Sequence, residues 1–509
     1  MVDPGPGRSG LLTRWGLPLA VFVLFAATAH GYGVFRDELY YIACARHLDW
    51  GYVDHPPLVA LIAWLASKGF GESWIALRML SAVAAAGTVL LVGDTSRDMG
   101  GGPWARFLAQ ALAATAPVYL ALFSIYSMNG FDVLIWAGLV RLAVRILAGG
   151  SRKLWLAFGV LAGIGLENKF DVALLSAGLV VGLVLARRFE VLLDRWLWIG
   201  GACAAALFAP HLVWQILHGW PTREFVANAQ RQKITVLGPI DFVTRQFLMA
   251  GPVGFSFALA GLGWLFTGRS AQAFRPLGWA AVAVLGVLAA SVSKPYYFAP
   301  TLTLLFPAAG VVLETWTLGR FARSARAVAL VAVASSLVLA PLVKPLLSVE
   351  GYVRYAAALG VAPGTDENHR MGRLPQFFAD MQGWREMVEA VAAVHAQLPP
   401  EDRAQACVYG QNYGEAAAID YFGPSLGLPP AISEHNSYWM WGPGSCNGAV
   451  VLIIGGDRKD HIRYFTSVEP AGVFRCADCM PYEDDLTIWV ARDHIVPIAE
   501  AWRGMHHYD

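Results

Sequence analysis

Long apolar runs separated by short polar connections fill the first 345 residues of the chain. Each run is close to the roughly 17 to 25 residues with which an α-helix crosses a bilayer. Eleven such runs lie at 12–31, 74–93, 104–122, 131–149, 154–168, 170–186, 196–216, 248–267, 277–293, 296–314 and 327–345. The pattern predicts a polytopic all-α membrane domain with about eleven transmembrane helices.

The polar pattern changes after Pro345. Residues 350–509 hold most of the acidic side chains and many turn residues, and they alternate strand-like and helix-like segments at 406–409, 412–422, 450–454, 459–465 and 486–490. About 160 residues are enough for an independent hydrophobic core. We predict a cytoplasmic tail at 1–14, a transmembrane domain at 15–345 and an α/β domain at 346–509.

Composition supports a membrane protein. The chain is 56% hydrophobic and 15% charged, with a mean hydropathy of +0.48, whereas soluble domains carry about 25% charged residues. Its net charge of +1 is too balanced for a nucleic-acid surface, which needs a concentrated basic patch. We therefore exclude nucleic acid as a partner.

Lys and Arg residues collect in alternate connections between the runs, for example Arg97, Arg145 and Arg187. Short cytoplasmic loops are enriched in these residues. We therefore predict a multi-pass protein of the cytoplasmic (inner) membrane with a cytoplasmic amino terminus, and with the α/β domain outside the cytoplasm. The first run has a rival interpretation as a cleaved signal peptide, because residues 27–29 read Ala-Thr-Ala. We favour a retained span, since the later charge alternation does not require cleavage.

Four cysteines fall in the predicted exported domain, namely Cys407, Cys446, Cys476 and Cys479. Oxidation is permitted outside the cytoplasm, so we expect one or two disulfides and leave their pairing open. Residues 476–479 also form a Cys-x-x-Cys motif that can begin a zinc site. Since no second such pair accompanies it, disulfides are the favoured interpretation.

Two adjacent carboxylates, Asp37 and Glu38, follow the first apolar run. An ionisable side chain costs about 2.5 to 3.5 kcal/mol at a bilayer centre, so charges beside membrane segments often mark functional sites. A carboxylate here can deprotonate an acceptor hydroxyl or hold a divalent cation. The structural alternative is that Asp37 caps a helix running to Leu48. Capping and catalysis are compatible.

Further acidic residues lie on the same predicted outer face. Asp54 and His55 precede two prolines, where an extended turn is the plain explanation. Asp132 opens an apolar run, where it is either a helix cap or a metal ligand and acid partner to Asp37.

Three basic residues are candidates for neutralising a phosphate. Lys169 lies between two apolar runs. It belongs either to a plain hairpin turn or to a site where its positive charge contacts an anionic leaving group. Lys294 precedes two tyrosines, which is typical of a membrane-interface belt. Arg231 belongs to the long outer loop 217–247, for which an amphipathic interfacial helix is an equal alternative.

The chain shows neither a Gly-rich nucleotide loop nor an Asp-x-Asp metal pair. A sugar donor anchored in lipid requires neither, because the membrane brings it to the protein. Two segments of the last domain, 409–415 and 434–442, are rich in amide and aromatic groups that suit sugars. Aromatic packing is the preferred account of both segments.

The order of these motifs resembles the C-type glycosyltransferase superfamily of protein O-mannosyltransferases and aminoarabinose transferases, of families 39 and 83. The most specific part is Asp37-Glu38-Leu-Tyr-Tyr followed by Asp54-His55-Pro-Pro-Leu, and the likeness covers roughly 15–345. It implies a GT-C fold and an inverting transferase that acts in cell-envelope glycosylation. Such an enzyme moves a hexosyl or pentosyl group from a polyprenyl-phosphate donor to a hydroxyl or phosphate acceptor on lipid, glycan or protein.

The resemblance also assigns residues. Asp37 matches the essential first-loop acid, as base or metal-associated group, and Glu38 is its neighbour. Asp132 matches a second-loop acid that helps to bind metal in some members. Lys169 matches a lysine near the lipid phosphate. The Asp54-His55 position holds an acid and a lysine in the aminoarabinose enzymes, so His55 departs from that pattern.

We therefore predict three sets of site residues. The catalytic set is Asp37 and Glu38. The donor-phosphate set is Lys169, His55, Arg231 and Lys294. The set for a divalent cation, which is a candidate cofactor, is Asp37, Asp132 and Asp54.

Two rival functions remain. A transporter or lipid flippase also has charged residues in a membrane domain, but transporters commonly show internal repeats and a site at the bilayer midplane. The polar clusters of this chain are predicted on one outer face, which favours the transferase. An inactive scaffold that keeps the fold is the third possibility.

Overall fold

The computed structural model describes residues 8–317 and 322–509. Residues 1–7 of the predicted tail lie outside the described residues. The chain divides into two compact units: unit 1 is Met1–Gly31, Ile75–Val213 and Thr235–Leu347, and unit 2 is Tyr32–Trp74, Trp214–Ile234 and Ser348–Asp509.

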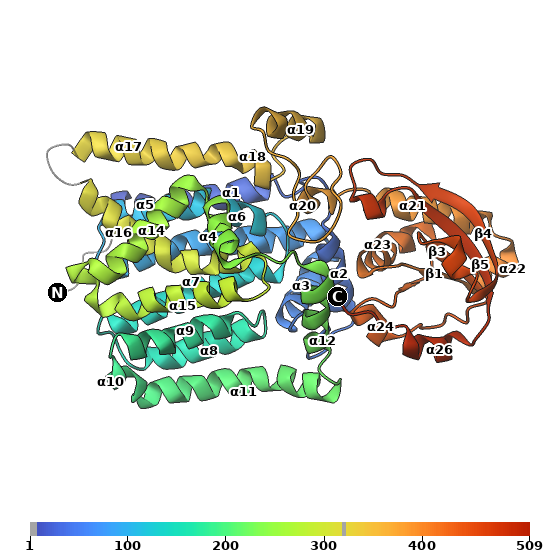
Figure 1. Ribbon diagram of the computed structural model, residues 1–509, viewed down its shortest axis with the longest axis horizontal. Helices are drawn as coiled ribbons and strands as arrows, with labels where there is room; N and C mark the ends of the chain where they lie inside the picture. The colour runs from blue at the N-terminus through green and yellow to red at the C-terminus, as the bar shows by residue number, and fades with distance from the viewer. Residues whose placement is uncertain (1–7, 318–321) are drawn as a thin grey trace. The chain divides into compact units, whose positions relative to one another are not determined.

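Unit 1 is helical, and its long helices run nearly parallel (Figure 1). Each of the predicted apolar runs overlaps at least one of its helices. The helices are α1 (Arg8–Ala27), α4 (Trp74–Asp98), α5 (Pro103–Thr115), α6 (Pro117–Leu122), α7 (Met128–Leu147), α8 (Leu154–Leu166), α9 (Val172–Leu185), α10 (Phe189–Leu192), α11 (Arg195–Leu217), α13 (Pro239–Met249), α14 (Pro252–Thr267), η2 (Arg269–Phe274), α15 (Arg275–Ala290), η3 (Pro295–Thr301), α16 (Leu302–Trp316), α17 (Ala322–Ser335), η4 (Ser336–Leu339) and α18 (Ala340–Val343).

Five helical segments among the described residues are long and apolar enough to cross a membrane, or six if α13 and α14 form one broken span. These two helices meet at 113°. The bend has a local cause, because Gly251 has φ +75° and Pro252 lacks the amide hydrogen that would continue the helix. Length and composition thus support a multi-pass membrane protein, whereas the predicted count of eleven spans stays a prediction.

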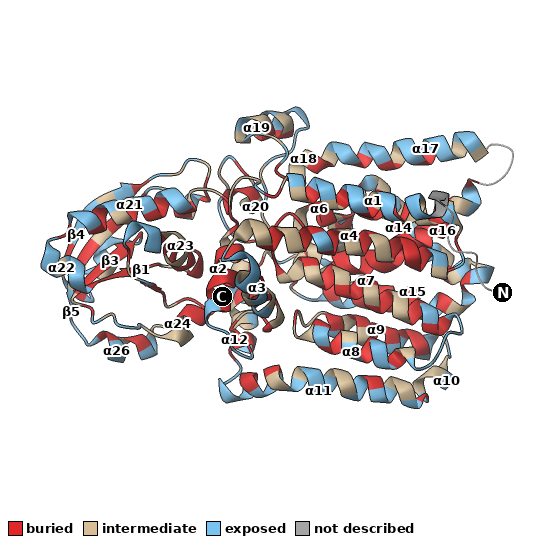
Figure 2. Ribbon diagram, turned by 180° about the vertical axis from the view of Figure 1, so that it is seen from behind, coloured by how far each residue is buried: buried red, intermediate tan, exposed pale blue. Residues whose placement is uncertain are grey.

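The helices of unit 1 differ in burial as expected of a bundle in lipid (Figure 2). In the segment Pro295–Trp316, 89% of the apolar stretch is buried, whereas in Arg195–Leu217 the buried share is 11%. Glycines allow close helix contacts: a Cβ on Gly159 would collide with Gly200, and a Cβ on Gly182 with Pro276. Small residues at such crossings are typical of membrane helix packing.

Unit 2 combines α-helices with one five-stranded sheet. Its helices are α2 (Arg36–Arg46), α3 (Leu58–Phe70), α12 (Pro221–Asn228), the π-helix η1 (Ala229–Lys233), α19 (Val349–Ala358), α20 (Gln376–Ala379), α21 (Trp384–Gln397), α22 (Pro400–Gln405), α23 (Tyr413–Phe422), η5 (Gly423–Leu426), α24 (Ser437–Trp441), α25 (Arg458–His461), η6 (Pro481–Glu483), α26 (Ile498–Ala501) and η7 (Trp502–Gly504). Its strands are β1 (Ala406–Tyr409), β2 (Ala431–Ile432), β3 (Val450–Ile454), β4 (Phe465–Phe474) and β5 (Leu486–His494).

The sheet has the order β2-β1-β3-β5-β4. Strands β2, β1 and β3 are parallel, and β5 runs antiparallel to both β3 and β4. The buried run Val450–Ile454 is the central strand β3. Four predicted strand or helix segments match β1, α23, β3 and β5. Strand β4 was not anticipated, because its sequence has no regular alternation of apolar and polar residues.

The core of unit 2 joins distant parts of the chain. Leu39, Tyr40 and Cys44 from α2 pack in one apolar cluster with Val388 and Ile419, which come from α21 and α23. The loop after the first helix is therefore folded together with the C-terminal residues.

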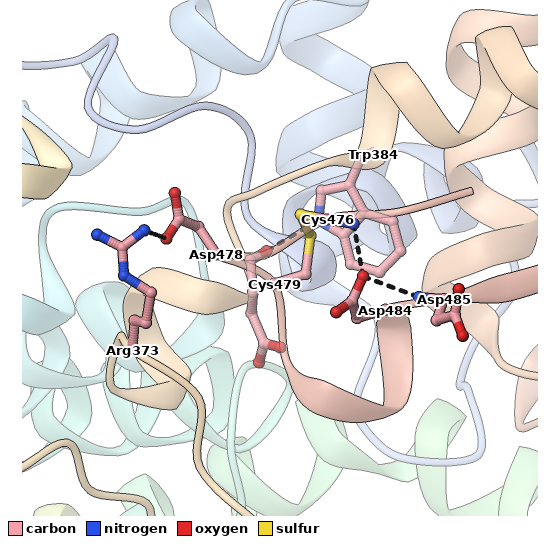
Figure 3. Close-up of a disulfide and its surroundings, with 8 residues drawn as sticks. Arg373, Trp384, Cys476, Asp478, Cys479, Asp484 and Asp485 are labelled. Atoms are coloured by element: carbon pink, nitrogen blue, oxygen red, sulfur yellow. Dashed lines mark hydrogen bonds and ion pairs between the residues drawn. A yellow bond between two sulfur atoms is a disulfide. The ribbon is translucent and has the colours of Figure 1, made fainter. Parts of the chain in front are cut away.

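Both disulfides are formed in unit 2. Cys407 on β1 pairs with Cys446, and Cys476 pairs with Cys479. Figure 3 shows the second bridge, where the Cys476 amide donates to Asp484 Oδ1 at 2.6 Å. The prediction of disulfides is confirmed. The two cysteines of the Cys-x-x-Cys motif form one of the bridges.

Candidate active site

Asp37 lies in the first turn of α2, and its side chain is 35% exposed. Its Oδ1 atom accepts a hydrogen bond from the Tyr413 hydroxyl at 2.8 Å. The Arg36 Nε atom lies 3.8 Å from the same oxygen. One carboxylate oxygen thus accepts the Tyr413 hydroxyl and lies near the Arg36 cation. The group remains open to solvent, as a base that must meet a substrate requires.

Glu38 has a different environment from its neighbour. It is fully buried, and its Oε2 accepts a hydrogen bond from the Phe35 amide at 2.8 Å. Phe35 is the N-cap of α2, so Glu38 closes the helix start in the manner of a capping box. The cap that sequence reasoning offered for Asp37 is made by Glu38. The first turn also benefits from both negative charges through the helix dipole.

Arg36 ties this helix start to the C-terminal segment within unit 2. Its amide donates to the Asp380 carbonyl at 3.0 Å, and its guanidinium donates to the Tyr482 hydroxyl at 2.9 Å. Asp380 is buried with its Oδ2 3.7 Å from the Arg36 Nη2. Burial raises the pKa of Asp380 to about 6, against the opposing pull of Arg36.

Asp54 and His55 contact side chains of α2. Asp54 Oδ1 accepts a hydrogen bond from Tyr40 at 2.9 Å. The His55 ring is fully buried, with Nδ1 2.8 Å from the Pro56 carbonyl and Nε2 3.7 Å from Cys44 Sγ. Both ring nitrogens of His55 have hydrogen-bond partners within the fold, which does not favour the phosphate role predicted for it.

A buried pair of carboxyl groups lies beside the start of α23. The Asn412 side-chain amide donates to Glu483 Oε1 at 2.9 Å and to Glu415 Oε1 at 3.2 Å. Burial and the neighbouring acid raise the pKa of Glu415 well above its ordinary value, and burial raises the pKa of Glu483 to about 7. The pair therefore retains a proton near neutral pH.

The other predicted residues of opposite charge meet in unit 1. Lys169, in the hairpin between α8 and α9, has its Nζ 3.8 Å from Asp132 Oδ2 and 3.0 Å from Asp171 Oδ2. The same Nζ lies 4.7 Å from the ring centroid of Tyr297 and 5.8 Å from that of Tyr296. Asp132 is fully buried on α7. The predicted hairpin is confirmed, and it brings Lys169 to Asp132.

Arg231 and Lys294 belong to different units of the chain. Arg231 is exposed on η1 of unit 2, and Lys294 is the N-cap residue of η3 in unit 1. Lys294 precedes Tyr296 and Tyr297, whose rings face Lys169.

The candidate cation ligands do not form a site in the described part of the chain. There, no group of three or more His, Cys, Asp or Glu residues is arranged to hold a metal ion. Asp37 and Asp54 each accept a tyrosine hydroxyl, and Asp132 lies beside the Lys169 ammonium group. The residues present do not fit the predicted cation, and no step of the reaction is derived through it.

Sequence reasoning missed three residues around Asp37. Arg36 and Asp380 carry no motif, and Tyr413 was read as aromatic packing. The only signal was the local richness of 409–415 in amide and aromatic groups, which does not say where the segment packs.

Comparison with known proteins adds evidence from outside the chain. A family model described as "Dolichyl-phosphate-mannose-protein mannosyltransferase" matches residues 54–214. The lipid A galacturonosyltransferase RgtD of Rhizobium johnstonii is 28% identical over 324 residues, which cover 61% of this chain and 66% of the relative. The matched part is thus just under two thirds of the relative's length.

The fold is shared with solved structures. ArnT from Cupriavidus metallidurans bound to undecaprenyl phosphate matches with a TM-score of 0.60 and 14% identity, covering 95% of this chain and 98% of ArnT. The apo state of the same protein gives a TM-score of 0.63 with 15% identity, covering 94% and 97%. The predicted resemblance is therefore confirmed: part of the chain is similar in sequence to the dolichyl-phosphate-mannose-protein mannosyltransferase family and to RgtD, and its fold is similar to that of ArnT.

Proposed function

We propose that this protein is an inverting glycosyltransferase that moves a sugar from a polyprenyl-phosphate donor to a hydroxyl or phosphate acceptor at the outer face of the cytoplasmic membrane. The observation that carries the proposal is the half-exposed Asp37 carboxylate, oriented by Tyr413 and Arg36, in a chain with the ArnT fold.

The chemistry needs one base and one stabilised leaving group. With a hydroxyl acceptor, the acceptor oxygen attacks the anomeric carbon and Asp37 takes its proton. The bond from that carbon to the phosphate oxygen breaks, and the polyprenyl phosphate leaves with the bonding electron pair. Attack from the opposite face inverts the anomeric centre.

Lys169 is the proposed contact for the donor phosphate. Its ammonium group is buried between two carboxylates and two tyrosine rings, so its position is fixed before a substrate arrives. A cation held in this way can stabilise developing negative charge without reorganisation. We propose Asp132 as its orienting partner.

The relatives suggest a substrate class. Since RgtD is named a lipid A galacturonosyltransferase and ArnT binds undecaprenyl phosphate, we propose an undecaprenyl-phosphate sugar as donor and a lipid A-like glycolipid as the first acceptor to test. Galacturonic acid is the first sugar to test.

The topology belongs to the proposal. The eleven spans rest on the apolar runs. The cytoplasmic amino terminus and the extracytoplasmic domain at 346–509 rest on the basic connections. Labelling with a membrane-impermeant maleimide tests this. In a variant without Cys44 and Cys203, a cysteine at the exposed Ser425 should react from outside intact cells, whereas one at the exposed Ser151 should react only after lysis.

Transfer itself is tested with the purified full-length protein in lipid vesicles. Undecaprenyl phosphate carrying galacturonic acid, aminoarabinose or mannose is supplied with lipid A, and the product is identified by mass spectrometry. We expect one donor to be used, with inversion at the anomeric carbon. Absence of transfer from every donor, together with movement of labelled lipid between the two leaflets, would support the flippase instead.

Asp37→Asn is the variant that tests the base. It keeps the size of the side chain and a group that can accept from Tyr413, but it cannot take a proton. We expect kcat to fall about 10²- to 10⁴-fold, the range of a general base, with unchanged thermal stability because the side chain is partly exposed. Wild-type transfer by this variant would contradict the assignment.

A further inference from the structure

The C-terminal segment places a tyrosine on the proposed base. Tyr413 is 7% exposed, and its hydroxyl donates to Asp37 Oδ1 at 2.8 Å. The two residues are separated by 376 positions in the chain, and both belong to unit 2. Burial raises the pKa of the Tyr413 phenol well above its ordinary value, so the hydroxyl keeps its proton and acts as the donor.

Tyr413 is held by its own helix start. It is the first residue of α23, and the N-cap Asn412 accepts hydrogen bonds from the amides of Gly414 and Glu415 at 2.8 and 3.1 Å. The Asn412 amide is fixed in turn by Glu415 and Glu483. The Asn412 side chain thus uses its oxygen to hold the backbone after Tyr413 and its nitrogen to hold two buried carboxyl groups. These bonds fix the backbone that carries the tyrosine.

The ring of Tyr413 is also confined. The Arg36 guanidinium lies 5.2 Å from its centroid, the Tyr40 ring 4.7 Å and the His435 ring 5.0 Å. A ring packed on three sides has few alternative rotamers, so its hydroxyl points at one place. That place is one oxygen of Asp37, which leaves the other oxygen for a substrate proton.

We propose that Tyr413 is a positioning residue for Asp37, through which the C-terminal domain completes the active site. This inference rests on the proposed transferase function. A hydrogen bond to a charged group is stronger than one between neutral groups, and orientation of a catalytic group acts on kcat more than on substrate binding.

The test is Tyr413→Phe in the full-length protein, with Tyr438→Phe as the matched control. Tyr438 is also buried, with 2% of its surface exposed, and its ring is 6.4 Å from Tyr40. Its hydroxyl donates to a different carboxylate, Asp420 Oδ2, at 2.7 Å. Each variant loses one buried hydroxyl-to-carboxylate bond, so the two should lose similar thermal stability. Only the first variant releases Asp37.

With undecaprenyl-phosphate galacturonic acid and lipid A, we expect Tyr413→Phe to lower kcat about tenfold or more while KM for the donor stays within about twofold. Tyr438→Phe should keep wild-type kcat. Equal kcat in Tyr413→Phe and wild type, or an equal loss in both variants, would overturn the inference and leave the transferase function standing.

A second readout does not depend on transfer. A water-soluble carbodiimide with glycine ethyl ester labels accessible carboxyl groups, and peptide mass spectrometry gives the extent of labelling at Asp37. Because Oδ1 loses its donor in Tyr413→Phe, we expect faster labelling of Asp37 there than in wild type or Tyr438→Phe. Unchanged labelling would refute the positioning contact even if the wild type transferred none of the sugars, a result that would separately reject the proposed function.

Discussion

Two neighbouring carboxylates, Asp37 and Glu38, have different environments because only one of them faces solvent. Asp37 is 35% exposed at its side chain, whereas Glu38 is fully buried against the amide of Phe35. Adjacent residues on a helix point about 100° apart, so the first turn of α2 sends one side chain outward and folds the other back onto its own N-terminus. The predicted catalytic role of Glu38 remains a hypothesis, and its geometry favours stability.

Substitutions at Glu38 test whether this residue stabilises the start of α2 rather than taking part in transfer. We expect Glu38→Ala to lower the free energy of unfolding by about 0.5 to 2 kcal/mol, the usual effect of losing a helix cap. Glu38→Gln keeps an oxygen acceptor for Phe35 and should retain most of the stability and transfer. Thermal unfolding and transfer are measured on the same preparations. A loss of transfer in Glu38→Gln as large as in Asp37→Asn would show instead that the charge of Glu38 is catalytic.

At the scale of elements, the hairpin between α8 and α9 depends on one lysine. Lys169 is 12% exposed and compensates Asp132 and Asp171, which are 1% and 11% exposed at their side chains. Removing one partner of a buried ion pair costs about 3 to 5 kcal/mol, because a charge is left without compensation.

We therefore expect Lys169→Met to lower the unfolding temperature of the purified protein strongly, and Asp171→Asn in the same chain to restore part of it. Tryptophan fluorescence during heating measures both. Lys153→Met is the control, since Lys153 is exposed at the start of α8. Equal unfolding temperatures for Lys169→Met and Lys153→Met would contradict the buried pair.

The free energy of unfolding is expected to depend on pH through the buried carboxyl groups beside the start of α23. Burial raises the pKa of Glu483 to about 7 from an ordinary value near 4.5, so the folded state favours the protonated form. The resulting stability is fully present below about pH 4.5 and is lost as pH rises through about 7. Its size is on the order of 3 kcal/mol. Asp380, with a pKa of about 6 in the fold, acts in the same direction at lower pH.

Unfolding temperatures between pH 5 and pH 8 should therefore fall toward alkaline pH, and the slope should be smaller in Glu483→Gln. At pH 8 this variant should be more stable than wild type, because it has no buried carboxylate to form. A wild-type slope retained in Glu483→Gln would assign the effect to other groups.

For the whole molecule, the loop at 32–74 and the C-terminal segment form one folding unit. A chain ending at Leu347 would lose the residues that pack against Leu39 and Cys44. We expect trypsin to cleave this shortened chain rapidly after Arg36, whose side chain is 11% exposed in the full chain. Mass spectrometry of the peptides measures the cleavage, and transfer should be abolished. Equal resistance of both chains at Arg36 would show that the loop folds without the C-terminal segment.

Most elements were predictable because their signals are local. The apolar runs, the hairpin at Lys169 and the buried strand at Val450–Ile454 each depend on residues close together in the chain. The short strand β2 and the polar-faced β4 escaped prediction because their hydrogen bonds to other strands, rather than their own sequence, define them. The helix α3 follows Pro57 and was not predicted as a separate element.

The sequence by itself determined the membrane character of the chain, the acidic first loop and the superfamily to which it is related, since composition and motif order carry all three. Only the tertiary structure decided which residues surround Asp37. Tyr413 and Asp380 lie more than 300 positions away from it, and no local pattern records a contact made by closing so long a loop. The cap at Glu38 was likewise decided by backbone geometry, because either acid of the pair satisfies the same sequence rule.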